Sequence, residues 1–596
     1  MAYSVALPWS DGEHRMHQLL NVPEHDNPTS NFLTPQATFA ANQFPLAAFS
    51  VLDSENRPWT TVWGGEPGFS QALGGNLLGT RTFVDNRHDP VIEAMVDQQF
   101  GKGNPKGMMF SGLPIDLVRR KRVKIAGRIV AGGVKAVGEE DTGVGEIQVV
   151  TKIDESLGNC PKYLNEKEIR PAIPNPKLIS VSPQLSKQAE DLIKKADLFF
   201  LSTANADINM DTNHRGGPPG FVRVISSGNA DEATAASIIY PEYSGNRLYQ
   251  SLGNLLNNPA IGICVPDFET GDVLYITGTA EVLIGDKADE FLPRTNLAVK
   301  ITIIEARHVE NGLPFRGRAG EESPYNPHVR LLASEGNVAS KFEKQSQKHV
   351  LLVSSEELSP TLSRYRFRSE EPVKYKPGQW AAFDFSEELD IGYSHMRDDD
   401  PTSLNDDFVR TFTVSSHPAD LPANEFEITA RLHGPVTAHL KRQRNFRTPL
   451  EVPMKGFGGD FKIDLGDSGV TPFIAGGAGI TPLLGQIRDL DVTKMHLFWT
   501  TKLEDAAFVL ETVKKHSGLA NTTTVFFTSS GNTAASNQKI DQLRDVGVDV
   551  KMRRPMKDDF ISINSERFYL CAGNPFRKTV LEWLAGKEVI YESFDY

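Results

Sequence analysis

Four consecutive residues in the C-terminal half, Arg410-Thr411-Phe412-Thr413, combine the side-chain types that could hold a flavin on one strand. A flavin needs a cation at its phosphate, a flat apolar group against the isoalloxazine, and a hydroxyl near N5. Alternate residues of a strand point to one face, so Arg410 and Phe412 can project together while Thr413 lines the edge. Alone, these residues would equally fit a strand that carries a salt bridge.

Two turns farther along the chain have the composition of phosphate-binding turns. Gly434-Pro435-Val436-Thr437 precedes a short predicted helix, where the Thr437 hydroxyl and free N–H groups would suit a pyrophosphate. Gly476-Gly477-Ala478-Gly479-Ile480-Thr481-Pro482 stands between a predicted strand and a predicted helix. Its glycines allow close approach of the backbone to a diphosphate, and Pro482 suits the first helical turn. Its spacing differs from G-x-G-x-x-G, so each turn alone could be purely structural.

A third motif, Cys571-Ala572-Gly573-Asn574-Pro575, also lies where a predicted strand enters a helix. Ligands of open α/β sheets bind at the carboxyl ends of the strands. A lone cysteine is more often a small buried hydrophobic residue, so the motif gains meaning only from its context.

The order of these motifs resembles the ferredoxin–NADP reductase superfamily from about residue 350 to the last residue. Lys376-Pro377-Gly378-Gln379 and Gly456-Phe457-Gly458-Gly459-Asp460-Phe461 match two further segments of that superfamily. The resemblance implies an FAD-binding antiparallel β-barrel over 346–468 and an NAD(P)-binding α/β domain over 469–596. The superfamily more often has Tyr where Phe412 stands, and the acidic insertion 386–409 has no counterpart that we can place.

The resemblance also implies roles for individual residues. Arg410 would bind the flavin phosphate, and Phe412 would stack on the ring. The other implied FAD contacts are Thr411, Thr413, Gly434, Pro435, Val436 and Thr437. The implied NAD(P) contacts are Gly476, Gly477, Gly479, Thr481, Pro482, Lys502 and Gly573. Those at the reacting centre would be Thr413, Cys571, Glu592 and Phe594. Lys502 and Thr528-Ser529-Ser530 could hold a 2′-phosphate, but the choice between NADH and NADPH stays open.

The N-terminal half contains two β-rich blocks of similar rhythm, over 41–180 and 181–305. The segment Glu66-Pro67-Gly68-Phe69 has a counterpart in Pro218-Pro219-Gly220-Phe221, and similar strand patterns follow each. We interpret the blocks as an internal duplication of a small β-barrel. Two unrelated β domains are the alternative, because shared turn residues are common in β proteins.

This half is similar to the pyridoxamine 5′-phosphate oxidase-like split barrels. The similarity rests on four runs: 158–163 (GNCPKY), 214–223 (HRGGPPGFVR), 245–247 (GNR) and 251–255 (SLGNL). Such barrels usually bind FMN between two subunits, and a tandem pair could build that interface within one chain. The resemblance implies Arg223 and Arg247 at the phosphate, with Asn246 and Ser251 nearby. A barrel that has lost its flavin and only scaffolds is the alternative.

Composition narrows the possible partners. The chain has 596 residues and a formal charge of −13, which disfavours nucleic acid. Its three cysteines cannot supply the four thiolates of an all-cysteine iron–sulfur cluster, so such a partner must be another chain. We expect no metal site, since no ligand cluster accompanies the histidine pairs. We expect no membrane segment, because no apolar run is long enough, and a cytoplasmic location.

The elements that must position these residues follow from the patterning. A polar arm is expected over 1–40 and a linker over 306–345, which is rich in Gly, Pro, Arg and Glu. After Val470 predicted strands and helices alternate, which indicates a parallel sheet with helices on both faces. The predicted fold class is therefore multidomain: a duplicated β split barrel, a flavin-binding antiparallel β-barrel, and an α/β nucleotide-binding domain.

These expectations together describe an NAD(P)H-dependent flavin oxidoreductase. Hydride from NAD(P)H would reduce FAD, and electrons would pass to FMN in the split barrel or directly to a small-molecule or protein acceptor. One alternative is a module that binds or senses flavin or haem, with an attached reductase. Another is an amine oxidase of the pyridoxamine-phosphate-oxidase type. The sequence leaves the acceptor open, and also the choice between monomer and homodimer.

Overall fold

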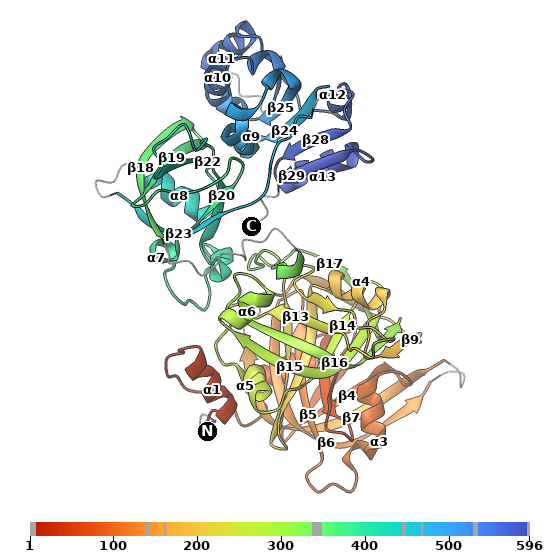
Figure 1. Ribbon diagram of the computed structural model, residues 1–596. Helices are drawn as coiled ribbons and strands as arrows, with labels where there is room; N and C mark the ends of the chain where they lie inside the picture. Colours follow the sequence, from red (N-terminus) through yellow and green to blue (C-terminus); the bar gives the residue numbers. More distant parts are fainter. Residues whose placement is uncertain are drawn as a thin grey trace. The chain divides into compact units, whose positions relative to one another are not determined.

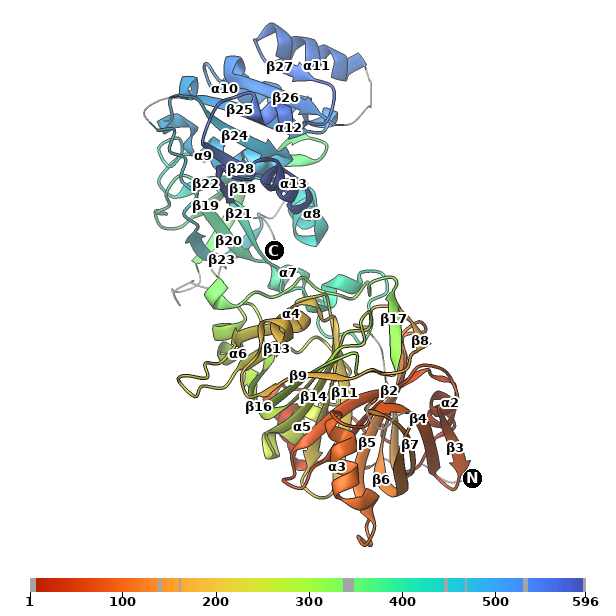
Figure 2. The ribbon, with the colours of Figure 1, turned by 90° about the vertical axis from the view of Figure 1, so that its right-hand side faces the viewer.

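The computed structural model describes residues 7–137, 142–159, 162–335, 348–443, 449–466, 469–528 and 534–592. The chain divides into two compact units (Figures 1 and 2). Unit 1 comprises Met1–Ser340 and Tyr393–Asp406, and unit 2 comprises Lys341–Gly392 and Asp407–Tyr596. The expected multidomain chain with several antiparallel sheets and one parallel sheet is confirmed. Part of the unplaced insertion, Tyr393–Asp406, belongs to unit 1, although its neighbours in the chain belong to unit 2.

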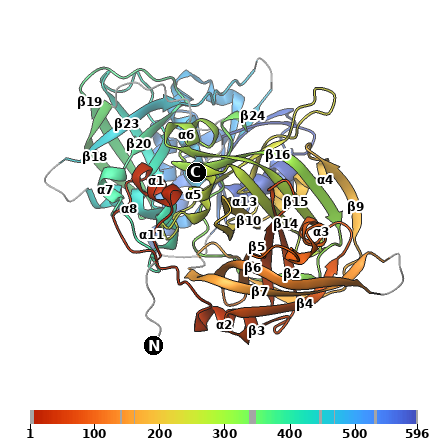
Figure 3. The same ribbon diagram turned by 90° about the horizontal axis from the view of Figure 1, so that it is seen from below.

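Unit 1 contains two antiparallel sheets with the same strand order (Figure 3). The first runs β2-β1-β5-β6-β7-β4-β3, and the second runs β11-β10-β14-β15-β16-β13-β12. The strands of the first sheet are β1 (Leu46–Leu52), β2 (Pro58–Gly64), β3 (Ser70–Gly74), β4 (Leu77–Asp85), β5 (Met108–Asp116), β6 (Lys121–Ala136) and β7 (Val144–Asn159). Those of the second are β10 (Leu198–Asn205), β11 (Asn209–Gly216), β12 (Arg223–Ser226), β13 (Ser237–Pro241), β14 (Ala260–Pro266), β15 (Val273–Ile284) and β16 (Leu297–Glu310).

The helices of unit 1 also occur at equivalent places. A helix precedes the first strand of each sheet, and another joins the fourth strand to the fifth. These are α2 (Pro35–Gln43) and α3 (Pro90–Asp97) in the first half, and α4 (Lys187–Lys195) and α5 (Gln250–Asn257) in the second. Two further helices are α1 (Asp11–Leu19) and α6 (Asp286–Phe291). The segment expected to be a polar arm therefore holds α1, which Ser10 and Glu13 cap, and α2.

A buried cluster of hydroxyls joins the two sheets of unit 1. Ser50 lies opposite Thr60 across β1 and β2, and Ser202 lies opposite Thr212 across β10 and β11. The Thr60 and Ser202 hydroxyls are 2.7 Å apart, and Thr212 donates to Ser50 at 2.9 Å. Each pair thus contacts the other through equivalent atoms, so an approximate two-fold relation links the halves.

The segment 306–345 differs from the linker that the sequence predicts. Strand β16 extends through Glu310, where it pairs with β9 (Lys177–Ser182). Strand β17 (Phe315–Ala319) then pairs with β8 (Lys167–Pro171). The five residues FRGRA are too short and too rich in Gly and Arg to give a strand pattern on their own. Pairing with β8 nevertheless places Phe315 and Gly317 inside.

Unit 2 begins with a six-stranded antiparallel sheet in the order β21-β20-β23-β18-β19-β22. A bridge between Val414, just after β21, and Ile428 on β22 joins the two edge strands, so the sheet closes into a barrel. Its core is rich in phenylalanine. Its strands are β18 (Lys348–Ser359), β19 (Leu362–Ser369), β20 (Trp380–Asp384), β21 (Val409–Thr413), β22 (Glu425–Arg431) and β23 (Glu451–Gly458), with helices α7 (Ser386–Leu389) and α8 (Gly434–Gln443).

The second part of unit 2 is a parallel sheet in the order β27-β26-β25-β24-β28-β29. Its strands are β24 (Thr471–Gly476), β25 (Met495–Thr501), β26 (Thr523–Phe527), β27 (Asp549–Lys551), β28 (Arg567–Cys571) and β29 (Glu588–Glu592). Its helices are α9 (Thr481–Gln486), α10 (Ala506–Lys515), α11 (Ala534–Asp545), α12 (Lys557–Ile561) and α13 (Asn574–Trp583). Strands β25, β26 and β27 follow one another outward on one side of β24, and β28 and β29 lie on its other side. None of the helices in the described ranges is long and apolar enough to cross a membrane.

Candidate functional site

The turn after β24 and the turn after β28 lie side by side at the carboxyl ends of neighbouring strands. Ala475 and Cys571 are in register across these strands. A Cβ atom on Gly479 would lie 1.9 Å from the backbone oxygen of Cys571, so only glycine allows this approach. The order of the sheet changes direction between β24 and β28, which is where open α/β sheets form their ligand crevice.

The residues predicted to hold the dinucleotide lie around this crevice. Most are glycines or buried residues, whereas Lys502 is an exposed cation. Gly477 has a φ of +57°, and Thr481 and Pro482 are buried at the start of α9. A Cβ on Gly573 would meet nothing within 4 Å, so its surroundings are open. Lys502 follows β25, is exposed, and pairs with Glu504 at 3.3 Å. Thr528 directly follows β26, at the carboxyl edge of the sheet where Lys502 also lies. Residues 529–530 lie outside the described residues.

A buried carboxylate, which sequence reasoning missed, joins the barrel of unit 2 to its parallel sheet. Asp505 accepts hydrogen bonds from Ser359 at 2.5 Å, Thr501 at 2.9 Å and Arg431 at 2.6 Å. Burial acts to raise the pKa of Asp505, but the hydrogen bonds from Ser359 and Arg431 outweigh it and lower the pKa. Arg431 thereby stays beside Gly477, 3.0 Å from the position of a Cβ there.

The predicted flavin residues on strand β21 alternate between its two faces, as expected for a strand. Val409, Thr411 and Thr413 are buried, while Arg410 and Phe412 share the more exposed face. The Thr411 hydroxyl is buried and has no hydrogen-bond partner among the described residues. Thr411 lies on the buried side of the strand, opposite to the face of Arg410 and Phe412.

The turn Gly434–Thr437 begins α8. The hydroxyl of Thr437 forms hydrogen bonds with backbone groups at this turn. Gly434 has a φ of +75°, which favours glycine. The Thr437 hydroxyl accepts from the His433 N–H at 2.6 Å and donates to the His433 carbonyl at 2.7 Å. Thr437 therefore fixes the turn, so a diphosphate there would use the backbone N–H groups of the turn.

Two side chains at the end of the parallel sheet have shifted ionisation. Cys571 is fully buried, and burial raises the pKa of its thiol. Glu592 is in register with Cys571 across β28 and β29. Burial, with a smaller effect of Asp460, raises the pKa of Glu592 to about 7. Phe594 lies outside the described residues.

Glu592→Gln is expected to flatten the pH dependence of stability. Since folding raises the pKa of Glu592 from 4.5 to about 7, the folded state holds a proton that the unfolded state releases in this window. The wild-type free energy of unfolding should therefore fall as pH rises from about 4.5 to about 7, and the variant should lack this contribution. Urea titrations across the window measure it. The control is Glu588→Gln. Glu588 is exposed, lies on the same strand as Glu592, and pairs with Arg567. Parallel wild-type and Glu592→Gln curves would contradict the assignment.

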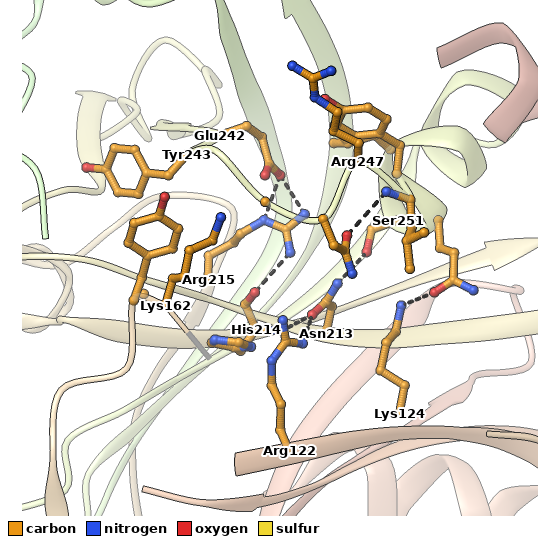
Figure 4. A pocket seen from close by; sticks show the side chains of 18 of the residues that line it. Arg122, Lys124, Lys162, Asn213, His214, Arg215, Glu242, Tyr243, Arg247 and Ser251 are labelled. Atoms are coloured by element: carbon orange, nitrogen blue, oxygen red, sulfur yellow. Dashed lines mark hydrogen bonds and ion pairs between the residues drawn. The ribbon is translucent and has the colours of Figure 1, made fainter. Parts of the chain in front are cut away.

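Unit 1 contains a polar pocket between its two halves (Figure 4). Strand β6 of the first sheet and strand β11 of the second contribute walls, Lys162 and Tyr163 come from the segment before β8, and the rest comes from Pro241 to Leu252, which includes the start of α5. The lining residues are Arg122, Lys124, Lys162, Tyr163, Asn213, His214, Arg215, Gly216, Pro241, Glu242, Tyr243, Gly245, Asn246, Arg247, Leu248, Tyr249, Gln250, Ser251 and Leu252.

Positive charge dominates this pocket. Its lining includes five cationic side chains and one carboxylate, Glu242, which pairs with Arg215 at 2.6 Å. Lys124 pairs with the nearby Asp211, and both side chains are over nine-tenths buried. Arg122, Lys162 and Arg247 line the pocket as well, so cationic side chains outnumber carboxylates in the lining by five to one. An anionic group fits such a lining.

The His214 Nδ1 and the Tyr243 hydroxyl, both buried in the pocket lining, have no hydrogen-bond partner among the described residues. Burial lowers the pKa of His214 well below its ordinary value, so its imidazole is neutral at pH 7. A buried polar atom without a partner is uncommon in folded proteins, so these atoms suggest a bound group.

The segment before α5 is strained. Arg247 and Tyr249 have φ values of 59° and 56°, a conformation that bulky residues rarely adopt. The ring of His17, on α1, holds the Arg247 carbonyl at 2.9 Å. Such strain persists where the surroundings enforce it, and it concentrates at ligand sites.

The two-fold relation predicts a second pocket, which aromatic side chains fill. The strand pairings place Trp63 where Arg215 stands in the other half, and Tyr275 where Lys124 stands. Trp63 and Tyr275 are each 1% exposed. The Trp63 N–H donates to Asp89 at 2.9 Å. In the described part of unit 1, buried aromatic side chains thus occupy the place that corresponds to Arg215 and Lys124, which line the pocket in the other half.

The structure brings together most, but not all, of the residues that the sequence suggested for FMN. Asn246, Arg247 and Ser251 line the pocket. Arg223 does not. It begins β12, where its guanidinium contacts Glu335 and the Gly220 carbonyl. Lys162 and Arg215 lie within runs already noted for their resemblance, but Arg122 and Lys124 had no sequence signal beyond a strand pattern. Cys160 is outside the described residues. Within the described ranges, no group of His, Cys, Asp and Glu side chains could hold a metal ion.

No family model matches this sequence, and no curated protein matches it. Solved structures do. The flavohem-like FAD/NAD-binding domain of nitric oxide dioxygenase from Vibrio cholerae O1 biovar El Tor is 15% identical, covering 42% of this chain and 99% of that one, with a TM-score of 0.31. Phthalate dioxygenase reductase is 14% identical, covering 42% and 68%, with a TM-score of 0.30. A ferredoxin NADP+ reductase from Neisseria gonorrhoeae with bound FAD and NADP is 15% identical, covering 42% and 100%, with a TM-score of 0.27.

Proposed function

We propose that this protein is an NAD(P)H-dependent flavin oxidoreductase, with FAD and NAD(P)H bound by unit 2 and FMN bound by unit 1. The observation that carries the proposal is the crevice between β24 and β28. The two motifs singled out from the sequence meet there, so closely that Gly479 cannot carry a side chain. A bound flavin supplies the redox chemistry, accepting hydride from a nicotinamide and releasing electrons to a further acceptor.

The residues of unit 2 fit these cofactors. The turn after β24 is rich in glycines, which place no side chain over the backbone N–H groups that would bind a diphosphate, and Arg431 lies beside Gly477. On β21, Arg410 and Phe412 share a face that suits a phosphate and a ring. The buried Cys571 thiol is neutral, and Glu592 is mostly protonated below its raised pKa of about 7, so in that range neither adds much charge where a nicotinamide would lie.

The pocket of unit 1 fits a flavin phosphate. The proposal treats the two sheets as a tandem split barrel, and their identical strand order and the reciprocal hydroxyl contacts support it. Arg247, Lys162 and Arg122 would bind the phosphate, with Asn246 and Ser251 beside them. The aromatic filling of the equivalent place means one FMN per chain. A small molecule or a separate redox protein would then accept the electrons.

Release of the cofactors with acid tests this function, and we expect one FAD and one FMN per chain. The double variant Lys162→Met, Arg247→Met should weaken FMN binding by about 100-fold and retain FAD, since it removes two charge-assisted contacts. Arg223→Met is the matched control, because the structure places that arginine outside the pocket lining.

The other outcomes separate the alternatives. FAD alone would reduce unit 1 to a scaffold or a substrate-binding barrel. A haem absorption band would favour the sensing module, and peroxide formation that requires an amine but no nicotinamide would favour the amine oxidase. Absence of any flavin, even after reconstitution, would refute the proposed function.

A further inference from the structure

The insertion between β20 and β21 supplies a segment of unit 1, Tyr393–Asp406, which we call the strap. In the chain the strap follows the barrel strand β20 and helix α7, and it leads into β21, which carries Arg410–Thr413. Within unit 1, several strap residues contact residues that line the pocket.

The first contact holds Arg247. The guanidinium of Arg247 stacks over the ring of Tyr393, 3.5 Å from its centre. The Tyr393 hydroxyl donates to the Gly245 carbonyl at 3.0 Å, in the same strained segment. The ring of Tyr393 is 44% exposed, so the stacking is a surface interaction of moderate strength. Tyr393 thus fixes the direction of a long cationic side chain.

Further contacts hold Lys162, Tyr163 and Ser244. The Lys162 ammonium donates to the His395 carbonyl at 2.8 Å. Asn405 donates to the Tyr163 hydroxyl at 2.9 Å and accepts from the Ser244 N–H at 2.9 Å. These groups of the strap are neutral, although the segment is acidic overall. An anion in the pocket would therefore meet no negative charge from these contacts.

The strap is itself anchored away from the pocket. The hydroxyl of Tyr325, in unit 1, donates to Asp398 of the strap at 2.5 Å. The carboxylate of Asp398 therefore binds Tyr325 and not the cations of the pocket. Within the strap, Arg397, which is 9% exposed, donates to the Ser403 hydroxyl at 3.1 Å and so fixes the shape of the segment itself. A fixed strap can hold its neighbours in one direction.

We infer that the strap is the positioning element of the anion pocket, and that it sets the selectivity of the pocket for a phosphorylated ligand by fixing Arg247 and Lys162. This inference rests on the proposed function, because the phosphate belongs to FMN. Long cationic side chains lose rotamer freedom when they bind a ligand, so holding them beforehand strengthens binding. Riboflavin, which lacks the phosphate, gains nothing from this effect. Tyr393 and His395 are therefore positioning residues.

The test compares FMN and riboflavin. Tyr393→Leu is expected to weaken FMN binding about fivefold, as loss of a surface cation–π contact implies, and to leave riboflavin binding unchanged. Tyr393→Phe, which keeps the ring, should recover most of the FMN affinity. Replacement of the whole strap by a short Gly-Ser turn should weaken FMN binding about tenfold or more, because it releases both cations. Asp399→Asn, an exposed change in the same segment, is the control. Flavin fluorescence quenching measures each affinity on the full chain.

Each outcome decides the inference. Equal losses for FMN and riboflavin, or no loss for either, would overturn it while the proposed function stands. If the wild-type protein binds neither flavin, the assignment of FMN to this pocket fails. Inorganic pyrophosphate then serves as the probe. Weaker pyrophosphate binding by Tyr393→Leu than by wild type would support the strap as a positioning element, and equal or absent binding would overturn it.

Discussion

Gly479→Ala should lower kcat/KM for NAD(P)H oxidation by about 100-fold, the effect of displacing binding groups by an ångström. The added Cβ would lie 1.9 Å from the Cys571 carbonyl oxygen, so the turns after β24 and β28 must separate. Steady-state oxidation of NADH and NADPH with ferricyanide measures the loss, and FAD content shows whether the barrel is intact.

Gly573→Ala is the matched comparison at the same crevice. A Cβ there meets nothing within 4 Å, and the φ of −62° suits alanine, so the Tm should not change. The methyl group would instead occupy space proposed for the nicotinamide, which should raise KM. If Gly479→Ala kept both its Tm and its kcat/KM, the crevice would not have the geometry described.

Lys124→Met is expected to lower the free energy of unfolding by about 3–5 kcal/mol, the range for removal of one partner of a buried ion pair. Lys124 and Asp211 are 6% and 8% exposed, and Lys124 also donates to Gln250 at 2.5 Å. The variant would leave Asp211 buried without its cation. Urea unfolding, followed by tryptophan fluorescence, measures the change.

Two further variants separate pairing from general destabilisation. Lys124→Met combined with Asp211→Leu should recover much of the loss, because neither charge then stays unpaired. Lys187→Met, which breaks an exposed pair with Asp191, should leave the free energy of unfolding almost unchanged. A double variant as unstable as Lys124→Met would show that the unpaired Asp211 is not the cause.

The sequence predicts unit 2 well because its signals are local. The motifs at 476–482 and 571–575 are turns at the ends of strands, and parallel strands bring their carboxyl ends to one edge whatever their order. The alternation of strands and helices likewise needs only short windows. Strand β27 escaped prediction, since its three residues, Asp549–Lys551, are too short for a pattern.

The pocket of unit 1 could be predicted only in part, because it combines distant residues. The β6 side chain of Arg122 donates to Asn213 on β11 at 2.6 Å, across 91 positions of sequence. No local pattern indicates that these strands meet. The strap is more distant still: its contacts with Gly245, Lys162 and Tyr163 span 148, 233 and 242 positions. Arg223, which the resemblance suggested for the phosphate, does not line the pocket, whereas Arg215 does, since which arginine faces a pocket depends on the partner strand.

The two sheets of unit 1, which contact each other through reciprocal hydroxyl pairs, determine how ligand binding responds when the protein is diluted. A ligand site formed between separate subunits disappears when the protein is diluted below the dissociation constant of the dimer. Here one polypeptide supplies both halves, so their effective concentration is fixed by the chain itself. Ligand occupancy should therefore depend on the concentration of free ligand alone. Covalent joining also frees the two halves to change independently, and a residue such as Trp63 can plug one place without closing the other.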